Sequence, residues 1–206
     1  DDNNALLFKK AGIRVPELYA ISENELYYLV EDLGDLSLYD ILKQEGESQR
    51  VKHYYHQALE QLLKIQLYGK DQIDFDRFAY PRADFDKQSV LWDLNYFKYY
   101  FLKLTGISFD EQKLEDEFHF LAKEIEKQKL KAFMFRDFQS RNIMVKKDNT
   151  VGFIDYQGGM KGAPQYDVAS LLWQAKANLP KEWKLNLLED YINYFEKIVG
   201  GYHEKI

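Results

Sequence analysis

Two short apolar runs joined by a tight turn constrain the fold of this chain more than any other sequence feature. The runs NIMVKK and TVGFID flank Asp148-Asn149, a pair typical of a two-residue hairpin turn. The stretch FMFRDFQS, residues 133–140, leads into the first run and ends in polar residues. We therefore expect a β-hairpin with polar side chains gathered at its open end.

The sequence around this hairpin shows two patterns, one typical of strands and one typical of helices. ELYAIS and ELYYLVE are short aromatic and β-branched runs separated by the polar residues 22–24, which predicts an N-terminal hairpin. After residue 36 the apolar residues recur at helical spacing. The pattern predicts an α+β fold, in which a small sheet precedes a mainly helical part that carries the embedded hairpin.

Capping signals and apolar stripes predict where helices begin and end. Ser37 with Asp40, and Ser108 with Glu111, have the spacing of capping boxes. Gly69 is expected to end the first stripe. The stripes are Leu59, Leu62, Leu63 and Leu67; Leu114, Phe118, Leu121 and Ile125; and Leu188, Ile192, Phe195 and Val199.

Composition and charge exclude several classes of protein. The 206 residues are 46% apolar, which is enough for a buried core, and the net charge of −6 argues against a nucleic-acid-binding protein. No run approaches the roughly eighteen apolar residues of a membrane span, and the start DDNNALLFKK lacks the features of a signal peptide. The chain has no cysteine for disulfides, thiol catalysis or zinc. We expect a cytoplasmic protein without nucleic-acid or membrane partners.

Three oxygen-bearing side chains meet at the open end of the hairpin if it forms as predicted. Asn142 precedes its first strand and Asp155 ends its second, and such ligands suit Mg²⁺, which takes one or two carboxylates and leaves its other positions to water and phosphate. Phosphoryl transfer also needs a carboxylate that orients the acceptor hydroxyl and takes its proton. Asp137 lies five residues before Asn142, as the corresponding aspartate does in kinases.

The ordered blocks RDFQSRNIM, GFIDYQGG and PQYDVASLL resemble the aminoglycoside phosphotransferase and choline kinase branch of the protein-kinase-like fold. The resemblance implies ATP as the phosphate donor, Asp137 as the catalytic aspartate and Arg136 as the arginine that precedes it. It implies Asn142 and Asp155 as the two magnesium ligands. Asp167 would be the aspartate that braces the catalytic loop from the following helix.

The same resemblance implies an adenine site between two lobes. The run YYLVEDLGDLSLYDIL looks like the hinge, where main-chain groups near Glu31, Asp32 and Leu33 would bond the base. Met144 and Ile154 would lie beneath the ring.

The resemblance also divides the chain. Residues 1–33 would be a remnant of the small lobe and hinge, and residues 34–206 the helical lobe with the catalytic loop and metal site. A kinase-like small lobe needs a phosphate loop and a strand lysine, and neither is visible here, so we expect this chain to be part of a longer protein. Phe135 stands where the family commonly has histidine. The run GGYHEKI follows YFEKIV abruptly, and an omitted segment between them is one interpretation.

The acceptor is the part of the prediction with most alternatives. EDLGD and YDVASLLWQA most resemble the bacterial phosphotransferases that include N-acetylmuramate and N-acetylglucosamine kinases, which implies an amino sugar. An aminoglycoside or an amino alcohol is the alternative acceptor. A nucleotide-binding regulatory domain that has lost catalysis is the alternative function.

The aromatic run LWDLNYFKYYFLK, residues 91–103, has two interpretations. Its aromatic residues recur at helical intervals, which favours core packing over stacking against a sugar. Asp93 or Asn95 would still be available to face an acceptor pocket. The aromatic residues concerned are Trp92, Tyr96, Tyr99 and Tyr100.

Overall fold

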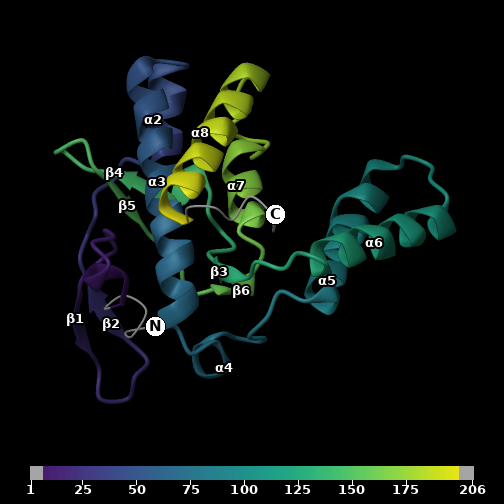
Figure 1. The fold of residues 1–206 in the computed structure, drawn as a ribbon, viewed down its shortest axis with the longest axis horizontal. Helices are drawn as coiled ribbons and strands as arrows, with labels where there is room; N and C mark the ends of the chain where they lie inside the picture. Colours follow the sequence, from purple (N-terminus) through teal and green to yellow (C-terminus); the bar gives the residue numbers. More distant parts are fainter. Residues whose placement is uncertain (1–6, 200–206) are drawn as a thin grey trace.

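The computed structural model describes residues 7–199 as a mixture of helices and short strands, which confirms the predicted α+β fold (Figure 1). The strands are β1 (Leu18–Ile21), β2 (Tyr28–Val30), β3 (Ala132–Met134), β4 (Ile143–Val145), β5 (Val151–Phe153) and β6 (Met160–Gly162). The α-helices are α2 (Leu38–Glu45), α3 (Gln49–Gln72), α4 (Phe75–Phe78), α5 (Lys87–Tyr100), α6 (Glu111–Glu126), α7 (Gln165–Leu172) and α8 (Lys181–Val199). Two 3₁₀ turns are η1 (Leu102–Thr105) and η2 (Ser140–Asn142).

Two of the predictions concern the boundary between the two lobes and a segment omitted near residue 200. The boundary between residues 33 and 34 falls between β2 and α2, and the division into two lobes there stays a prediction. The segment predicted to be omitted near residue 200 lies outside the described residues. None of the described helices combines the length and apolar character that crossing a bilayer requires.

Within the described residues the strands form three antiparallel pairs, β1–β2, β3–β6 and β4–β5. Both predicted hairpins are therefore confirmed. In β4–β5, Ile143 pairs with Phe153 and Val145 pairs with Val151. The turn between them contains Asn149 at a φ of 62°, a left-handed conformation that asparagine tolerates better than most residues.

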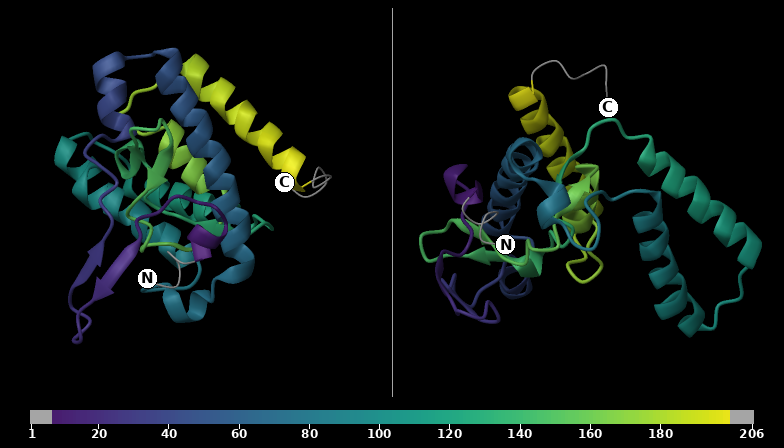
Figure 2. Two further views of the ribbon diagram at one scale, coloured as in Figure 1. Left: turned by 90° about the vertical axis from the view of Figure 1, so that its left-hand side faces the viewer. Right: turned by 90° about the horizontal axis from the view of Figure 1, so that it is seen from below.

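The long helix α3 lies at the centre of the described structure and packs against β3 and α8 (Figures 1 and 2). Its predicted stripe faces this core, because Leu59, Leu62 and Leu63 are fully buried and Leu67 is half-buried. Burying a side chain of this size stabilises the fold by roughly 1.5–3 kcal/mol. The helix thus supports β3 of the β3–β6 pair and β5 of the β4–β5 hairpin.

The predicted helix end at Gly69 is wrong, because α3 continues to Gln72. Gly69 lies inside the helix where Phe133 of β3 packs against it. A Cβ atom at position 69 would lie 2.7 Å from the Phe133 Cβ, closer than any side chain tolerates. The glycine therefore allows a close approach of helix and strand, and its usual role as a helix stop does not apply.

The two predicted capping boxes have different outcomes. The Ser37 hydroxyl accepts from the Asp40 backbone N–H at 3.2 Å, and the Asp40 carboxylate accepts from the Ser37 N–H at 3.1 Å, which confirms the first. The second is wrong, because Asp110 and not Ser108 caps α6. The Asp110 carboxylate accepts from two backbone N–H groups of the first turn, and aspartate and serine are equally good caps.

The tip of the β4–β5 hairpin is tied to α3. Asn149 Oδ1 accepts from the Tyr54 hydroxyl at 2.8 Å and from Arg50 at 3.3 Å. The Asn149 carbonyl accepts from Gln57 Nε2 at 3.1 Å. These partners lie between 92 and 99 positions earlier in the chain. The contacts fix the hairpin against the helical core at the end opposite Asp155.

Helices α5 and α6 form a pair that projects away from the rest of the molecule (Figures 1 and 2). The two helices are joined by ion pairs from Lys98, a buried lysine of α5, to Glu111 at 2.5 Å and Glu115 at 2.6 Å. Lys103 adds a third ion pair to Glu111 at 2.9 Å. These charged contacts join the pair together with a small apolar cluster that includes Val90 of α5 and Ala122 of α6.

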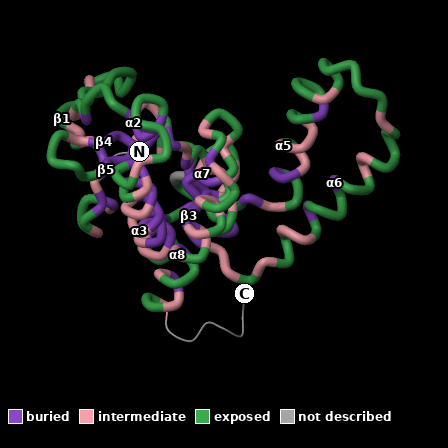
Figure 3. The backbone as a smooth tube through the Cα atoms, turned by 90° about the horizontal axis from the view of Figure 1, so that it is seen from above, coloured by how far each residue is buried: buried purple, intermediate pink, exposed green. Residues whose placement is uncertain are grey.

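The core packing predicted for the aromatic residues of α5 is wrong. Trp92 is 49% exposed and Tyr96 is 65% exposed, and much of the pair is exposed along its length (Figure 3). Tyr99 and Tyr100 are exposed as well. The reason is that α5 packs chiefly against α6 and η1, so only one narrow face of the helix is covered.

Candidate active site

The loop between β3 and β4, residues 135–142, carries most of the predicted site. Arg136 lies near its start in the left-handed region, with a φ of 78°. Asp155, just after β5, is left-handed too, with a φ of 68°. Non-glycine residues adopt this conformation at a cost, and they keep it only where their surroundings hold them. Both strained residues belong to the predicted site.

Asp167, from α7, holds the backbone of this loop. Its carboxylate accepts from the Phe135 N–H at 2.7 Å and from the Arg136 N–H at 2.9 Å. Asp167 is completely buried, and this burial raises its pKa to about 7, although the two N–H donors act in the opposite direction. The structure thus places Asp167 where a brace of the catalytic loop is predicted.

Asn142 connects the two predicted carboxylate positions. Its Nδ2 donates to the Asp137 backbone carbonyl at 2.9 Å and to Asp155 Oδ2 at 3.1 Å. The other oxygen of Asp155 accepts from Gln157 Nε2 at 2.7 Å. The Asp137 residue is exposed, and its carboxylate contacts Gln139 Nε2 at 3.5 Å. The structure therefore brings the three predicted polar residues together and leaves the Asp137 carboxylate accessible.

The Arg136 side chain joins the loop to the base of α5. Its guanidinium forms an ion pair with Asp93 at 2.6 Å and lies over the Phe85 ring, 5.6 Å from the centroid. The second Asp93 oxygen accepts from the Tyr166 hydroxyl at 3.4 Å. Burial raises the pKa of Asp93, and the Arg136 charge opposes that effect. Asp93 thus lies beside the catalytic loop, engaged with two of its neighbours.

A cleft of about 700 Å³ opens between the β1–β2 sheet and the open end of the β4–β5 hairpin. This volume is within the range of small-molecule sites, roughly 300–1,000 Å³. None of the described residues that line it is a lysine or an arginine. The lining includes Leu18, Tyr28, Val30, Asn142, Ile154 and Asp155. Both predicted metal ligands therefore border a cavity large enough for a ligand.

The residues predicted to bind adenine are divided by the structure. Ile154 lines the cleft, whereas Glu31, Asp32, Leu33 and Met144 do not. Met144 is buried within β4, and Leu33 is buried as well. The Asp32 carboxylate accepts from the backbone N–H two residues later, at 2.8 Å, which stabilises a turn. The adenine role of these four residues stays a prediction.

Glu31, in the segment predicted to be the hinge, binds basic side chains. Its carboxylate forms ion pairs with Arg14 and, at 3.8 Å, with Lys146. Its backbone N–H donates to the Glu17 carbonyl at 2.8 Å. Although burial opposes the change, the Arg14 contact and its neighbours lower the pKa of Glu31. These bonds join the segment before β1 to the segment after β2.

Phe135 is held by aromatic packing. It is buried and makes edge contacts with Phe138, Tyr156 and Phe133, with centroids 5.2, 6.4 and 6.5 Å apart. Its backbone N–H, as described above, is satisfied by Asp167. The phenylalanine therefore keeps the loop in place without a side-chain hydrogen bond.

Sequence analysis missed Gln174, which holds the other end of the loop. Gln174 Oε1 accepts from the Ser140 hydroxyl at 2.6 Å and from the Ser140 N–H at 3.2 Å. Its Nε2 contacts Gln139 at 3.5 Å. The residue follows α7 in a run of mixed polarity, and no spacing in the sequence distinguished it.

Sequence analysis also missed Gln66, for which a signal existed. Gln66 lies on the same helical face as Leu59, Leu62 and Leu63, and it is completely buried. Its Nε2 donates to the Pro164 carbonyl at 2.9 Å. A polar residue on an apolar stripe has to find a buried partner, and that requirement pointed to a role beyond packing.

The donor atoms of Asn142 and Asp155 fit a magnesium site. Because the Asn142 amide nitrogen donates to Asp155, its amide oxygen is the atom left to bind a cation. Residues 7–199 contain no cluster of three or more histidine, cysteine, aspartate or glutamate side chains suited to a metal. A cation held by the protein alone does not fit here, whereas one shared with water and phosphate does.

Comparison with known sequences decides the family. The sequence model described as "Phosphotransferase enzyme family" matches residues 3–204. The chain belongs to this family. An N-acetylmuramate/N-acetylglucosamine kinase from Neisseria meningitidis serogroup B is 24% identical to the phosphotransferase chain over 189 residues, which are 90% of this chain and 53% of that relative. The chain thus spans about half the length of the curated relative it matches.

Solved structures show the same fold as the phosphotransferase chain. Choline kinase LicA from Streptococcus pneumoniae superposes with a TM-score of 0.60 at 14% identity, covering 91% of this chain and 59% of that one. Aminoglycoside phosphotransferase APH(4)-Ia, solved with ADP and hygromycin B, gives 0.55 at 15% identity, with coverages of 97% and 67%. The predicted kinase-like fold is therefore confirmed.

Proposed function

We propose that this phosphotransferase chain transfers the γ-phosphoryl group of ATP to a hydroxyl group of a small molecule, with Mg²⁺ as the metal. The observation that carries the proposal is the meeting of Asp137, Asn142 and Asp155 beside a ligand-sized cleft in a chain of this family. The ADP complex of APH(4)-Ia supports an adenine nucleotide as the donor.

Asp137 is the proposed catalytic residue. Its exposed carboxylate orients the acceptor hydroxyl and takes the proton, while Asn142 fixes its backbone carbonyl. The acceptor oxygen forms a bond to the γ-phosphorus as the bond from that phosphorus to the β,γ-bridging oxygen breaks. ADP leaves with the electron pair, and the proton passes from Asp137 to water.

The remaining site residues bind and orient. Asn142 and Asp155 would hold Mg²⁺, which when bound neutralises charge on the phosphate oxygens. Ile154 would pack against the adenine ring from the cleft wall. Arg136 orients the loop and does not bind the substrate in this proposal, because its guanidinium pairs with Asp93 and keeps the loop aligned with α5.

For the acceptor we propose an amino sugar such as N-acetylmuramate or N-acetylglucosamine, because the Neisseria relative carries that name. An aminoglycoside or an amino alcohol is the second candidate, favoured by the fold that the chain shares with choline kinase LicA and APH(4)-Ia. Both classes of acceptor would present a hydroxyl group to Asp137, and they differ from each other in charge and size.

The test is transfer of labelled phosphate from ATP with magnesium across a panel of N-acetylmuramate, N-acetylglucosamine, choline and aminoglycosides. Asp137→Ala is the inactive variant, and Asp148→Asn, at the opposite end of the same hairpin, is the matched control. Transfer to one acceptor that is lost only with Asp137→Ala supports the proposal and names the substrate. Nucleotide binding without transfer to any acceptor favours the regulatory alternative.

A further inference from the structure

A buried polar contact links α8 to α3, behind the catalytic loop. The Tyr191 hydroxyl donates to Gln66 Oε1 at 2.6 Å, and Gln66 Nε2 donates to the Pro164 carbonyl at 2.9 Å. Gln66 is completely buried and Tyr191 is 7% exposed. Two buried side chains with satisfied polar groups at this depth form a fixed arrangement, because each lost partner would leave a polar atom without water.

The Pro164 carbonyl that Gln66 holds lies at the start of α7, the helix whose first turn carries Asp167. Gln66 also lowers the pKa of Asp167, against the larger raising effect of burial. Asp167 accepts from the N–H groups of Phe135 and Arg136. The contacts therefore run from Tyr191 through Gln66 to the start of α7, and from Asp167 on that helix to the backbone of the catalytic loop.

The Tyr191 hydroxyl determines which end of the Gln66 amide faces the start of α7. An amide presents an oxygen acceptor on one side and an NH₂ donor on the other. With the oxygen bonded to Tyr191, the NH₂ group donates to the Pro164 carbonyl. The reversed amide would place its oxygen against that carbonyl, and it is disfavoured as long as the hydroxyl is present.

We propose that Gln66 and Tyr191 are positioning residues of the active site, which hold the start of α7 and, through Asp167 on that helix, keep the left-handed backbone at Arg136 and so aim Asp137. The catalytic half of this inference rests on the proposed phosphotransfer, whereas the structural half does not. Neither residue lines the cleft, and both act through the Pro164 carbonyl at the start of α7.

The charged and titratable groups around Asp167 set the expected pH dependence. Burial and the Asp137 charge raise the pKa of Asp167, whereas the two loop N–H groups and, after them, Gln66 lower it. The Asp167 charge raises the pKa of the hydroxyls of Tyr166 on α7 and Tyr191 on α8, in addition to burial. A Gln66 amide that turns its oxygen toward α7 should therefore raise the pKa of Asp167 further.

The test compares Tyr191→Phe with Tyr194→Phe, the same change three residues later on α8. Backbone amide hydrogen exchange is measured at Phe135 and Arg136, with the amides of β4 as an internal reference for global opening. We expect Tyr191→Phe to speed exchange at the loop about fivefold, the size of one net hydrogen bond, without a matching change in β4. Tyr194→Phe is expected to leave the loop unchanged.

A second variant and an activity readout separate positioning from packing. Gln66→Glu keeps the shape of the side chain but replaces the donor to the Pro164 carbonyl with an acceptor, and it should speed loop exchange more than Tyr191→Phe does. In the transfer assay, Tyr191→Phe should lower kcat with KM for ATP unchanged. It should also move the acid limb of the kcat profile upward by roughly half a pH unit to one unit.

Each outcome decides the matter. Equal loop exchange in Tyr191→Phe and Tyr194→Phe would overturn the proposal, whatever the activity. Faster loop exchange together with the shifted acid limb supports both halves. Faster loop exchange in Tyr191→Phe, found together with no phosphate transfer by the wild-type protein, supports the structural half and contradicts the proposed function.

Discussion

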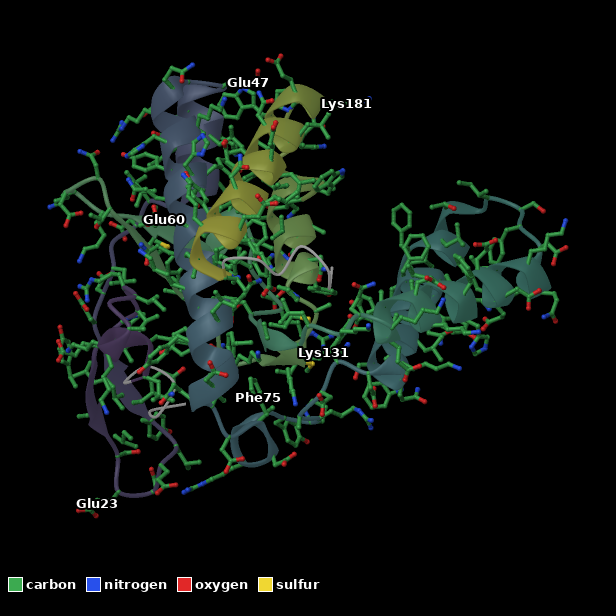
Figure 4. The ribbon with its side chains drawn as sticks, in the orientation of Figure 1. Glu23, Glu47, Glu60, Phe75, Lys131 and Lys181 are labelled. Carbon is green, nitrogen blue, oxygen red and sulfur yellow. The ribbon has the colours of Figure 1, made fainter. Side chains whose placement is uncertain are left out.

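Asp167 and Trp92 stand in surroundings opposite to those their side chains usually occupy. Asp167 is a carboxylate with no exposed surface, and Trp92 is a large aromatic residue with 49% of its surface exposed. In Figure 4 side chains fill the space between α3, α7 and α8, while Lys131 marks the return from the projecting α5–α6 pair to the body. Burial in this chain thus follows tertiary contact, because Asp167 bonds the loop from α7, which packs against α8, whereas α5 packs chiefly against α6.

The two regions differ in what a substitution removes. Around the loop the buried polar groups of Asp167, Gln66 and Tyr191 have bonded partners, and a change there leaves an uncompensated donor or acceptor. On the outer faces of the α5–α6 pair a change removes apolar surface that is already in water. We therefore expect large effects of conservative changes in the first region and small effects of drastic changes in the second.

Asp137→Asn should have the largest effect, and it tests whether the order of the loop serves chemistry. A general base contributes about 10²- to 10⁴-fold to a rate, so we expect kcat for phosphoryl transfer to fall by about that factor. The thermal midpoint should change little, because the residue is exposed. Steady-state kinetics at saturating ATP, with Asp148→Asn as control, is the measurement. Unchanged turnover would remove Asp137 from its proposed role.

Asp167→Asn should have the next largest effect, now on stability. Asparagine keeps one acceptor oxygen for two backbone donors, so one N–H of the loop loses its partner. We expect the free energy of unfolding to fall by about 1–3 kcal/mol. Urea unfolding measures it, and Asp116→Asn on α6 is the exposed counterpart. A loss no larger than that of the counterpart would show that the loop is held by other contacts.

The stability contribution of Asp167 should depend on pH with a defined sign. Burial raises its pKa to about 7 in the folded protein, so between the ordinary carboxyl pKa and about 7 the folded state keeps a proton that the unfolded state has released. The contribution is therefore fully present at low pH and is lost as pH rises through 7. Between pH 5 and 6 it falls by up to about 1.4 kcal/mol per pH unit.

The measurement for this sign is the difference in unfolding free energy between wild type and Asp167→Asn as a function of pH. The difference should shrink from pH 5 to pH 7. A difference that grows over this interval would mean that the hydrogen bonds to the carboxylate, chiefly the two from the loop N–H groups, outweigh burial and that the carboxylate is ionised throughout.

Tyr96→Ser should have the smallest effect, and it sharpens the contrast with the loop. The Tyr96 ring stacks on Tyr100 with centroids 4.4 Å apart, yet both side chains are largely exposed. We expect the free energy of unfolding to change by less than about 0.5 kcal/mol. The same change at the fully buried Tyr55 should cost about 3–5 kcal/mol. Similar losses at the two positions in thermal unfolding would contradict the division drawn here.

Features set by neighbouring residues were predictable from the sequence. The β4–β5 hairpin followed from Asp148-Asn149, and the start of α2 followed from Ser37 and Asp40, because turn and cap preferences act over a few residues. The approach of Asn142 to Asp155 followed from the hairpin itself.

Features set by tertiary contact were not predictable in the same way. Gly69 was taken for a helix end because nothing local shows that Phe133 packs on it. The spacing of the α5 aromatics indicated a helix correctly but not what covers it. The polar role of Gln66 depends on Tyr191 and the Pro164 carbonyl, which lie more than 90 residues away in the chain.

The contacts of Asn149 with α3 have a consequence for the order in which the chain folds. A hairpin with a tight turn closes in microseconds, so β4 and β5 are expected to pair early. Docking its tip on Tyr54 requires closing a loop of 95 residues, which is slower. Substitutions in the turn should therefore give folding φ-values near one, and Tyr54→Phe a value near zero. The two proposed metal ligands would then be paired first and placed last.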